Sequence, residues 1–334
     1  MLASLVRAPL GITVLFAASS LLLLALVVEA QEAKKVARVG YLAAVSAAAD
    51  APRAEAFRQG LRELGYIEGQ NLSIAFRYES TMFDRLPELA AELVRLKIDV
   101  LVTVTTNAAI AGKNAAGAVP IVFMGVTDPV GAGLVDSLPR PGGTRTGITN
   151  MAAALTAKRL QLLKEVLPRL SRLAVLWDPN GPGSIPQWKE SQLAAGELGL
   201  QVLSMEVSSV DKYEDAFQDV ARAGSTAMAV TLNPLANSNQ KRIADLAINH
   251  RVPTICARTD FAENGCLMSY GPSYGVEGRD GARYVDKILK GVKPADLPVQ
   301  QPTTFELAIN MNTARALGLT IPNSLLLRAD QVIR

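Results

Sequence analysis

The chain has 334 residues, with 34 Lys and Arg against 31 Asp and Glu, one His, two Cys, and 49% hydrophobic but only 5% aromatic residues. The apolar content excludes a disordered chain, and two cysteines are too few for a disulfide-stabilised scaffold. A formal net charge of +3 is close to neutral, so it gives no reason to expect nucleic acid or an anionic membrane as a partner. The length favours two lobes, with one large α/β domain as the alternative.

The first thirty residues have the pattern of an export signal. Arg7 supplies a basic start, residues 10–28 are uncharged and apolar, and Val28 and Ala30 carry small side chains around a cut after Ala30. We therefore expect a signal peptide at 1–30 and a mature protein in the periplasm or another extracytoplasmic space. The alternative is an uncleaved membrane anchor, because the apolar stretch approaches the length of about 20 residues that spans a bilayer. No cysteine lies near the cut, which disfavours a lipoprotein.

Beyond the signal, strand-like and helix-like patterns alternate. In the first half, strands are expected at 36–42, 72–78, 99–105 and 121–126, with helices at 52–64 and 86–94. In the second half, strands are expected at 172–177, 202–207, 227–232, 253–257 and 266–268, with helices at 187–198, 213–223, 240–250 and 277–291. The alternation predicts parallel strands joined by helical crossovers.

The two halves have the same element order. Glu63-Leu64-Gly65 and Glu197-Leu198-Gly199 end the first helix of each half at equivalent points. We therefore predict two similar α/β lobes. Residues 141–149 are rich in Pro, Gly and Thr, a composition typical of an exposed turn, so we place the hinge between the lobes there.

Candidate binding residues follow the strands, because open parallel sheets bind ligands at the carboxyl ends of their strands. These positions are rich in hydroxyls, amides, carboxylates and aromatic rings, which suit gripping a small polar molecule better than transforming one. The candidates are Tyr41, Ser46, Thr105, Thr106, Asn107, Asp128, Trp177, Asn180, Asn233, Asp260 and Tyr270. Any single Ser, Thr, Asn or Asp here fits an ordinary helix cap equally well, so the prediction rests on the whole group.

Members of this group have distinct expected roles. Ser46, Thr105 and Thr106 lie where helices begin, so free N–H groups there can accept a carboxylate or another anion. A carboxylate, from Asp128 or Asp260, can hold an ammonium group. Three aromatic residues can stack on an apolar side chain of a ligand: Tyr41, Trp177 and Tyr270.

Catalytic and cofactor motifs fail when they are tested. Residues 271–275 match the G-x-S-x-G pattern of a hydrolase, but that order needs a histidine after Ser273, and the sole histidine is His250. A dinucleotide fingerprint at 131–133 fails at Asp136, and Gly112-Lys113 lacks the Ser or Thr of a phosphate-binding loop. One His and two Cys are too few for a structural zinc site. We expect no enzymatic activity, no cofactor and no metal.

The two cysteines leave two interpretations open. Cys256 and Cys266 are ten residues apart, so in an oxidising compartment they can form a disulfide that closes a short loop. Both also lie on or beside predicted strands, where cysteine often packs as a small apolar residue. The sequence does not choose between the two.

Several segments resemble a known family. The stretch 120–143, PIVFMGVTDPVGAGLVDSLPRPGG, closely resembles a hallmark of the ABC transporter substrate-binding family that includes tryptophan- and tyrosine-binding members. Further segments of the C-terminal half are similar to the same family: 265–273, 284–291, 294–303 and 316–322. Together the resemblance covers roughly residues 36–334.

The resemblance implies a type I periplasmic-binding-protein fold, in which two α/β lobes close on a ligand and present it to permease subunits in the membrane. In that fold the chain crosses the hinge three times, which we expect near 147, 270 and 301. The expected first lobe comprises 36–147 and 271–300, and the second comprises 148–270 and 301–334. The implied function is the extracytoplasmic solute-binding component of an ABC importer, a monomer that takes an amino acid or a similar small polar ligand, including aromatic ones.

The resemblance also bears on the site. Thr105, Thr106 and Asp128 stand where the first-lobe binding loops of the family do, while Asn233, Asp260 and Tyr270 lie on the facing loops. Many relatives have Pro after the threonine of the first loop, whereas this chain has Asn107, which leaves the preference for an aromatic ligand open.

Three alternatives belong to other classes of protein. A membrane-anchored sensor would keep residues 10–28 as an anchor, and an exported hydrolase would need an acid/base pair such as Asp128 with Asp260. A LacI-like regulator would need a DNA-binding segment in front of the lobes, where residues 1–35 hold the signal pattern instead.

Overall fold

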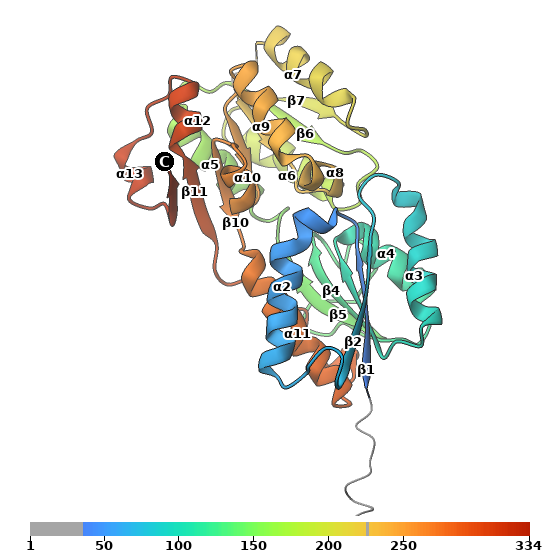
Figure 1. Ribbon diagram of the computed structural model, residues 1–334. Coiled ribbons are helices and arrows are strands. Elements are labelled where there is room, and N and C mark those ends of the chain that lie inside the picture. Colours follow the sequence, from blue (N-terminus) through green and yellow to red (C-terminus); the bar gives the residue numbers. More distant parts are fainter. Residues whose placement is uncertain (1–35, 225–226) are drawn as a thin grey trace, which may run out of the picture. The chain divides into compact units, whose positions relative to one another are not determined.

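The computed structural model describes residues 36–224 and 227–334, in which two β-sheets are each covered by helices on both faces (Figure 1). Residues 37–334 form one compact unit. The predicted export signal at 1–30 lies outside the described residues. Among the residues that are described, no helix is both long and apolar enough to cross a bilayer.

The first sheet has the strand order β2-β1-β3-β4-β5, and all its pairs are parallel. Its strands are β1 (Ala37–Ala43), β2 (Leu72–Tyr78), β3 (Val100–Val104), β4 (Ile121–Val126) and β5 (Arg145–Thr149). Helices α2 (Ala47–Glu63) and α11 (Tyr274–Leu289) pack on one face. The other face is covered by η1 (Phe83–Arg85), α3 (Leu86–Arg95) and α4 (Thr106–Ala115).

Strand β1 illustrates how both faces of this sheet are buried. Val39 and Tyr41 point to the layer of α2 and α11, whereas Leu42 points to the layer of α3 and α4. Successive side chains of a strand alternate between faces, so a strand that is covered on both faces is apolar at nearly every position. This is why the central strands appear in the sequence as short continuous apolar runs.

The second sheet has the order β12-β11-β10-β9-β8-β6-β7. Its strands are β6 (Arg172–Trp177), β7 (Gln201–Glu206), β8 (Ala227–Val230), β9 (Thr254–Cys256), β10 (Met268–Gly271), β11 (Glu306–Asn310) and β12 (Gln331–Ile333). One face is covered by α5 (Thr156–Val166), α6 (Ser184–Glu197), α12 (Met311–Ala316) and α13 (Asn323–Leu326). The other is covered by α7 (Lys212–Arg222), α8 (Pro234–Ser238), α9 (Gln240–Asn249) and α10 (Thr259–Glu263).

The predicted α/β class, with parallel sheets between helices, is confirmed. The order β2-β1-β3-β4-β5 of the first sheet recurs as β7-β6-β8-β9-β10 in the second. One pair differs from the expected parallel arrangement, because β10 and β11 are antiparallel. Strand β11 follows a segment that includes η2 (Pro294–Asp296) and returns from the first sheet, so no helical crossover within one sheet fixes its direction.

The chain passes between the two sheets three times. It leaves the first sheet after β5, returns between β10 and α11, and crosses again between η2 and β11. The first crossing was expected near 147, a position inside β5, which pairs with β4 as far as Thr149. Residues 305–310 bring the chain back to the second sheet, where Glu306 pairs with Gly271.

Cysteines 256 and 266 are joined by a disulfide, which settles the choice that the sequence left open. The bond links the last residue of β9 to the segment just before β10, its neighbour in the sheet.

Helices α2 and α11 approach each other closely at glycines. A Cβ atom at Gly60 would lie 2.8 Å from the Cβ atom of Ala282, and one at Gly278 would lie 2.5 Å from the carbonyl oxygen of Arg53. The absent side chains therefore let the two backbones meet, and this contact places Arg53 of α2 next to Glu277 of α11.

We expect Gly278→Ala to destabilise the protein by about 1–3 kcal/mol, because the added methyl group overlaps the backbone of α2 and forces it to shift. Gly275→Ala in the same helix is the matched control, since the nearest atoms to its added Cβ lie 4.0 Å away. It should leave the stability unchanged or raise it by up to about 1 kcal/mol. Urea unfolding measures both, and equal effects of the two changes would contradict the close contact.

Candidate functional site

A pocket lies where the carboxyl ends of the strands of both sheets face each other. It encloses about 450 Å³ of empty space when the open solvent at its mouth is included. Its walls come from both lobes and are formed by Arg53, Thr105, Thr106, Asn107, Gly125, Thr127, Asn150, Gly183, Leu232, Asn233, Pro234, Asn237, Arg258, Pro272 and Glu277. This is the place that the rule for open parallel sheets predicts.

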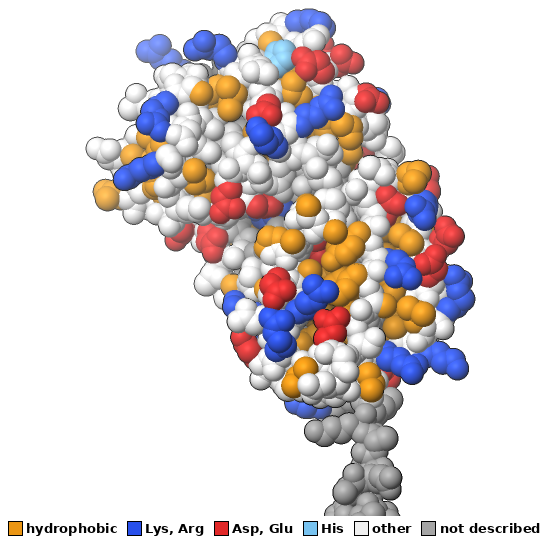
Figure 2. All heavy atoms as spheres, in the orientation of Figure 1, with side chains coloured by type: hydrophobic (Ala, Val, Ile, Leu, Met, Phe, Trp, Pro, Cys, Tyr) orange, Lys and Arg blue, Asp and Glu red, His pale blue; other side chains and the backbone are white. Residues whose placement is uncertain are grey.

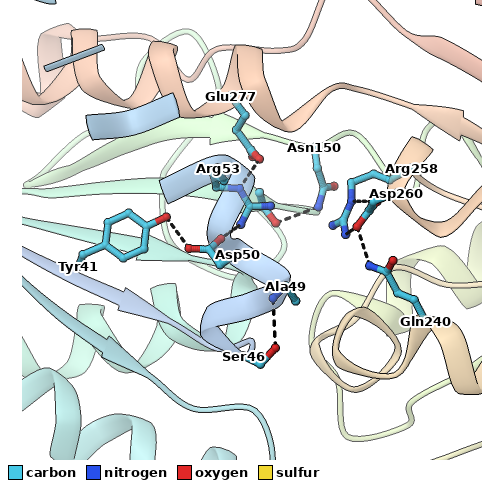
Figure 3. A network of polar contacts seen from close by, with 11 residues as sticks. Tyr41, Ser46, Ala49, Asp50, Arg53, Asn150, Gln240, Arg258, Asp260 and Glu277 are labelled. Atoms are coloured by element: carbon cyan, nitrogen blue, oxygen red, sulfur yellow. Dashed lines mark hydrogen bonds and ion pairs between the residues drawn. The ribbon is translucent and has the colours of Figure 1, made fainter. Parts of the chain in front are cut away.

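Two buried arginines line the pocket, one from each lobe, and Figure 3 shows both. Arg53 on α2 is 3% exposed; its Nη1 lies 3.0 Å from Asp50 Oδ1 and its Nε donates to Glu277 Oε2 at 2.8 Å. Arg258, at the start of α10, is also 3% exposed and donates two hydrogen bonds to Asp260, of 2.8 and 2.7 Å. Charge-assisted hydrogen bonds of this kind fix the orientation of both guanidinium groups.

The charges of the two lobes act on each other across the pocket. Burial raises the pKa of Asp50 to about 6, although Arg53 and the hydroxyl of Tyr41 oppose the rise and Arg258 of the other lobe adds to that opposition. Burial also acts to raise the pKa of Asp260, but Arg258, together with Gln240 and the more distant Arg53, holds it below its usual value. The two arginines therefore share one electrostatic environment.

Among residues 36–224 and 227–334, four buried side-chain atoms on the pocket wall have no hydrogen-bond partner. They are Thr105 Oγ1, Asn107 Oδ1, Asn237 Oδ1 and Glu277 Oε1. Buried polar atoms in native proteins are nearly always hydrogen-bonded, so such a group on one cavity wall indicates a site for a ligand that donates hydrogen bonds.

Gly125 keeps space open in front of the ion pair. A Cβ atom there would lie 3.1 Å from Glu277 Oε1 and 3.7 Å from an Nη atom of Arg53. The absence of a side chain therefore leaves space beside the carboxylate oxygen of Glu277 that has no hydrogen-bond partner.

The loop before α4 is strained where it meets the pocket. Thr105 has φ 80° and ψ 163°, a region that is essentially restricted to glycine, and it is a β-branched residue. Such a conformation costs about 1–3 kcal/mol and persists only where the surroundings impose it. It places the hydroxyl of Thr105 at the pocket wall, so this strain is an independent indication of function.

The two lobes touch at the pocket. A Cβ atom at Gly183 of the second lobe would lie 2.9 Å from Thr106 Oγ1 and 3.0 Å from Thr127 Oγ1 of the first. Asn150, on the first crossing between the sheets, donates a hydrogen bond of 2.8 Å to the carbonyl oxygen of Gly125. Backbone of one lobe therefore lies against hydroxyl groups of the other at the pocket.

Some of the residues predicted from the sequence lie at this pocket. Its walls include Thr105, Thr106, Asn107 and Asn233. Two more lie directly behind it: Asp260 holds Arg258, and Tyr41 donates a hydrogen bond of 2.7 Å to Asp50. Tyr41 is completely buried, so its ring is part of the core of the first lobe instead of a surface for stacking.

The remaining predicted residues lie elsewhere. Ser46 caps α2, and Asp128 accepts a hydrogen bond from the Gly131 N–H in a turn. Asn180 lines a neighbouring groove. The two aromatic rings pack within the second lobe, Trp177 on Trp188 and Tyr270 on Phe305.

Sequence reasoning missed Arg53, Asn237 and Glu277, and it gave no binding role to Arg258, which follows strand β9. It inspected the loops that follow the strands, whereas Arg53, Asn237 and Glu277 lie inside helices. A signal was present in α2, because Asp50 and Arg53 share the face of Ala54, Phe57 and Leu61, all of which are buried. Charged residues on the apolar face of a helix need a partner or a role.

Asp50 should make stability fall as the pH rises from about 4 to 6. Its pKa in the folded protein, about 6, lies above the ordinary value of 3.8, so in this window the folded state binds the proton more tightly than the unfolded state does. We expect the stability of the wild type relative to Asp50→Asn to fall by about 2–3 kcal/mol across it. Urea unfolding at a series of pH values measures the difference, with Asp245→Asn on α9 as the control; a difference independent of pH would contradict the raised pKa.

Comparisons with known proteins agree with this architecture. A protein of Clostridioides difficile (strain R20291) described as a tyrosine-binding protein is 26% identical over 263 residues, which are 79% of this chain and 75% of that protein. The crystal structure of a conserved domain protein from Vibrio cholerae has a TM-score of 0.85 at 30% identity and covers 89% of this chain and 100% of its own. The structure of an ABC domain in complex with L-Trp from Streptococcus pneumonia has a TM-score of 0.84 at 28% identity, covering 89% and 99%.

The family assignment rests on nearly the whole described chain. The model of the family described as ABC transporter substrate binding protein matches residues 38–333, which span both sheets and all three crossings between them. The resemblance inferred from the sequence is thereby confirmed, and the chain belongs to the ABC transporter substrate-binding protein family.

Proposed function

We propose that this protein is the extracytoplasmic solute-binding component of an ABC importer and that it closes its two lobes on an amino acid. The observation that carries the proposal is the pocket between the lobes, whose wall contains one arginine from each lobe and four buried polar atoms without hydrogen-bond partners. The relatives described as tyrosine-binding and as a complex with L-Trp support an amino acid, including an aromatic one.

The charges on the pocket wall match an amino acid zwitterion. The guanidinium groups of Arg53 and Arg258 suit a carboxylate, because their planar N–H groups bind it in a fixed geometry. The free oxygen of Glu277 suits an ammonium group, and the amide oxygens of Asn107 and Asn237 offer further acceptors.

Closure follows from the origin of these groups. Arg53 and Glu277 pack with the first sheet, whereas Arg258 and Asn237 belong to the second. A ligand that contacts both sets interacts more strongly with the closed arrangement than with an open one, so its binding shifts the equilibrium toward closure. Permease subunits in the membrane would then receive the closed, monomeric form.

The N-terminal segment separates this proposal from a membrane-anchored sensor. We propose that residues 1–30 are removed on export, and intact-mass analysis of the exported protein distinguishes cleavage from retention. The geometry does not support the hydrolase alternative, which needs Asp128 and Asp260 as an acid/base pair. Asp128 accepts a hydrogen bond within a turn, and Asp260 is paired with Arg258.

The first test is a thermal-shift screen of the exported protein with amino acids, other carboxylates, nucleosides and sugars. A ligand that binds only the folded state raises the melting temperature, so we expect shifts with amino acids, confirmed by calorimetry and by recovery of the ligand chemically unchanged. Shifts with sugars or nucleosides alone would overturn the amino acid assignment.

We expect Arg258→Lys to lower the affinity for the amino acid that binds best by about tenfold or more. Lysine keeps a positive charge beside Asp260 but lacks the planar fork of N–H groups that binds a carboxylate. Arg242→Lys on the exposed side of α9 is the matched control and should leave the affinity unchanged. Calorimetric titration measures both; an unchanged affinity for Arg258→Lys would remove this residue from the carboxylate site.

We expect Thr105→Gly to stabilise the protein and yet weaken ligand binding. Glycine relieves a strain of about 1–3 kcal/mol but loses about 0.5–1 kcal/mol more chain entropy on folding, so the net gain should be about 1 kcal/mol. The hydroxyl at the pocket wall is lost at the same time. Urea unfolding and ligand titration of the same variant measure the two effects; a loss of both stability and affinity would contradict the strain.

A further inference from the structure

A wide groove opens beside the pocket, on the same side of both sheets. It holds about 2020 Å³ of empty space, its open mouth included, against about 450 Å³ for the pocket. Its first-lobe wall is made of residues 81–87 with Asn107, Ile110, Ala111 and Asn114 of α4, and its second-lobe wall of Asp178, Asn180, Pro182, residues 208–211 and Leu235.

Asn107 belongs to the walls of both spaces. It lines the pocket and also the groove, and its buried Oδ1 atom has no hydrogen-bond partner. The pocket and the groove are therefore neighbours that share a wall at the first turn of α4.

The walls of the two spaces differ in character. Among the wall residues whose side chains the structure describes, none is aromatic, and the larger apolar side chains are Leu232, Pro234 and Pro272. The groove carries Met82, which is 55% exposed, and the ring of Phe83. It also contains further apolar side chains on both walls, namely Ile110, Val210 and Leu235.

The groove is also unfavourable to anions. Three carboxylates lie on its walls, on Asp84, Asp178 and Asp211, against one guanidinium group, on Arg85. That guanidinium lies 3.7 Å from a carboxylate oxygen of Glu79, so part of its field is already neutralised.

We infer that the groove is the side-chain compartment of the binding site, and that the ligand is an amino acid with a large side chain that is not acidic. The pocket holds the zwitterionic head that all amino acids share, while the groove receives the part that differs among them. This inference rests on the proposed function, because it needs the head group in the pocket. It adds a specificity surface formed by η1, the first turns of α3 and α4, and the facing loops of the second lobe.

The test narrows the groove without touching the pocket. Asn114 is exposed and lines the groove but not the pocket, so Asn114→Trp places a bulky ring in the groove. Gln192→Trp, at an exposed position of α6 outside both spaces, is the matched control. Calorimetric titrations of the exported protein with L-Ala, L-Phe, L-Tyr, L-Trp and L-Glu give the affinities.

We expect the wild type to bind the best of L-Phe, L-Tyr and L-Trp at least tenfold more tightly than L-Ala, and to bind L-Glu more weakly than L-Ala. Asn114→Trp should lower the affinity for the large amino acids at least tenfold and the affinity for L-Ala less than twofold. Gln192→Trp should change neither affinity. Phe83→Ala is a second variant, which removes apolar surface from the groove. It should also lower the affinity for the large amino acids more than the affinity for L-Ala. Circular dichroism confirms that each variant is folded.

The outcomes separate the two proposals. If large and small amino acids bind the wild type equally well, or if Asn114→Trp weakens both equally, the groove is not the side-chain compartment and the proposed function stands. If the wild type binds no amino acid at all, both proposals are overturned.

Discussion

The ion pairs of Arg53 are the interaction on which the rest of the site depends. This buried guanidinium is held by Asp50 of its own helix and by Glu277, 224 residues later in the chain. Burying a charge is costly unless it is paired and hydrogen-bonded, so Arg53 can face the pocket only because α11 lies against α2. Glycines at 60 and 278 permit that approach. The second crossing of the chain, between β10 and α11, is therefore required for the site, because it brings α11 and Glu277 back to α2.

Around this pair, the structure keeps several features that lower its stability. Thr105 is strained, four polar atoms on the pocket wall lack partners, and the raised pKa of Asp50 shows that its charge is not fully compensated. Strain and unsatisfied groups usually gather where a protein performs its function. Their concentration between the lobes, where Gly183 meets Thr106, distinguishes this pocket from the other cavities of the described chain.

Sequence patterns predict local elements well, because burial on both faces of a sheet makes short apolar runs distinctive. The strands at 121–126 and 172–177 have the predicted bounds, and the rule for strand ends places Thr105 and Asn233 at the pocket. The partnership of Arg53 with Glu277 is a tertiary contact that no local pattern reveals. Conversely, Trp177 and Tyr270 follow the same rule but pack on Trp188 and Phe305, because an aromatic residue at a strand end can also complete the core of its lobe.

The division of the site into a polar pocket and an amphipathic groove bears on how one fold can serve many ligands. Contacts to a zwitterionic head cannot discriminate among amino acids, so specificity has to come from a surface that the head does not touch. Here that surface belongs to η1, the start of α3 and the loops at 178–182 and 208–211. Loops accept substitutions more readily than the buried strands do. Asn107 lines both spaces, so a change of residue there alters the wall that they share and leaves the arginine pair in place.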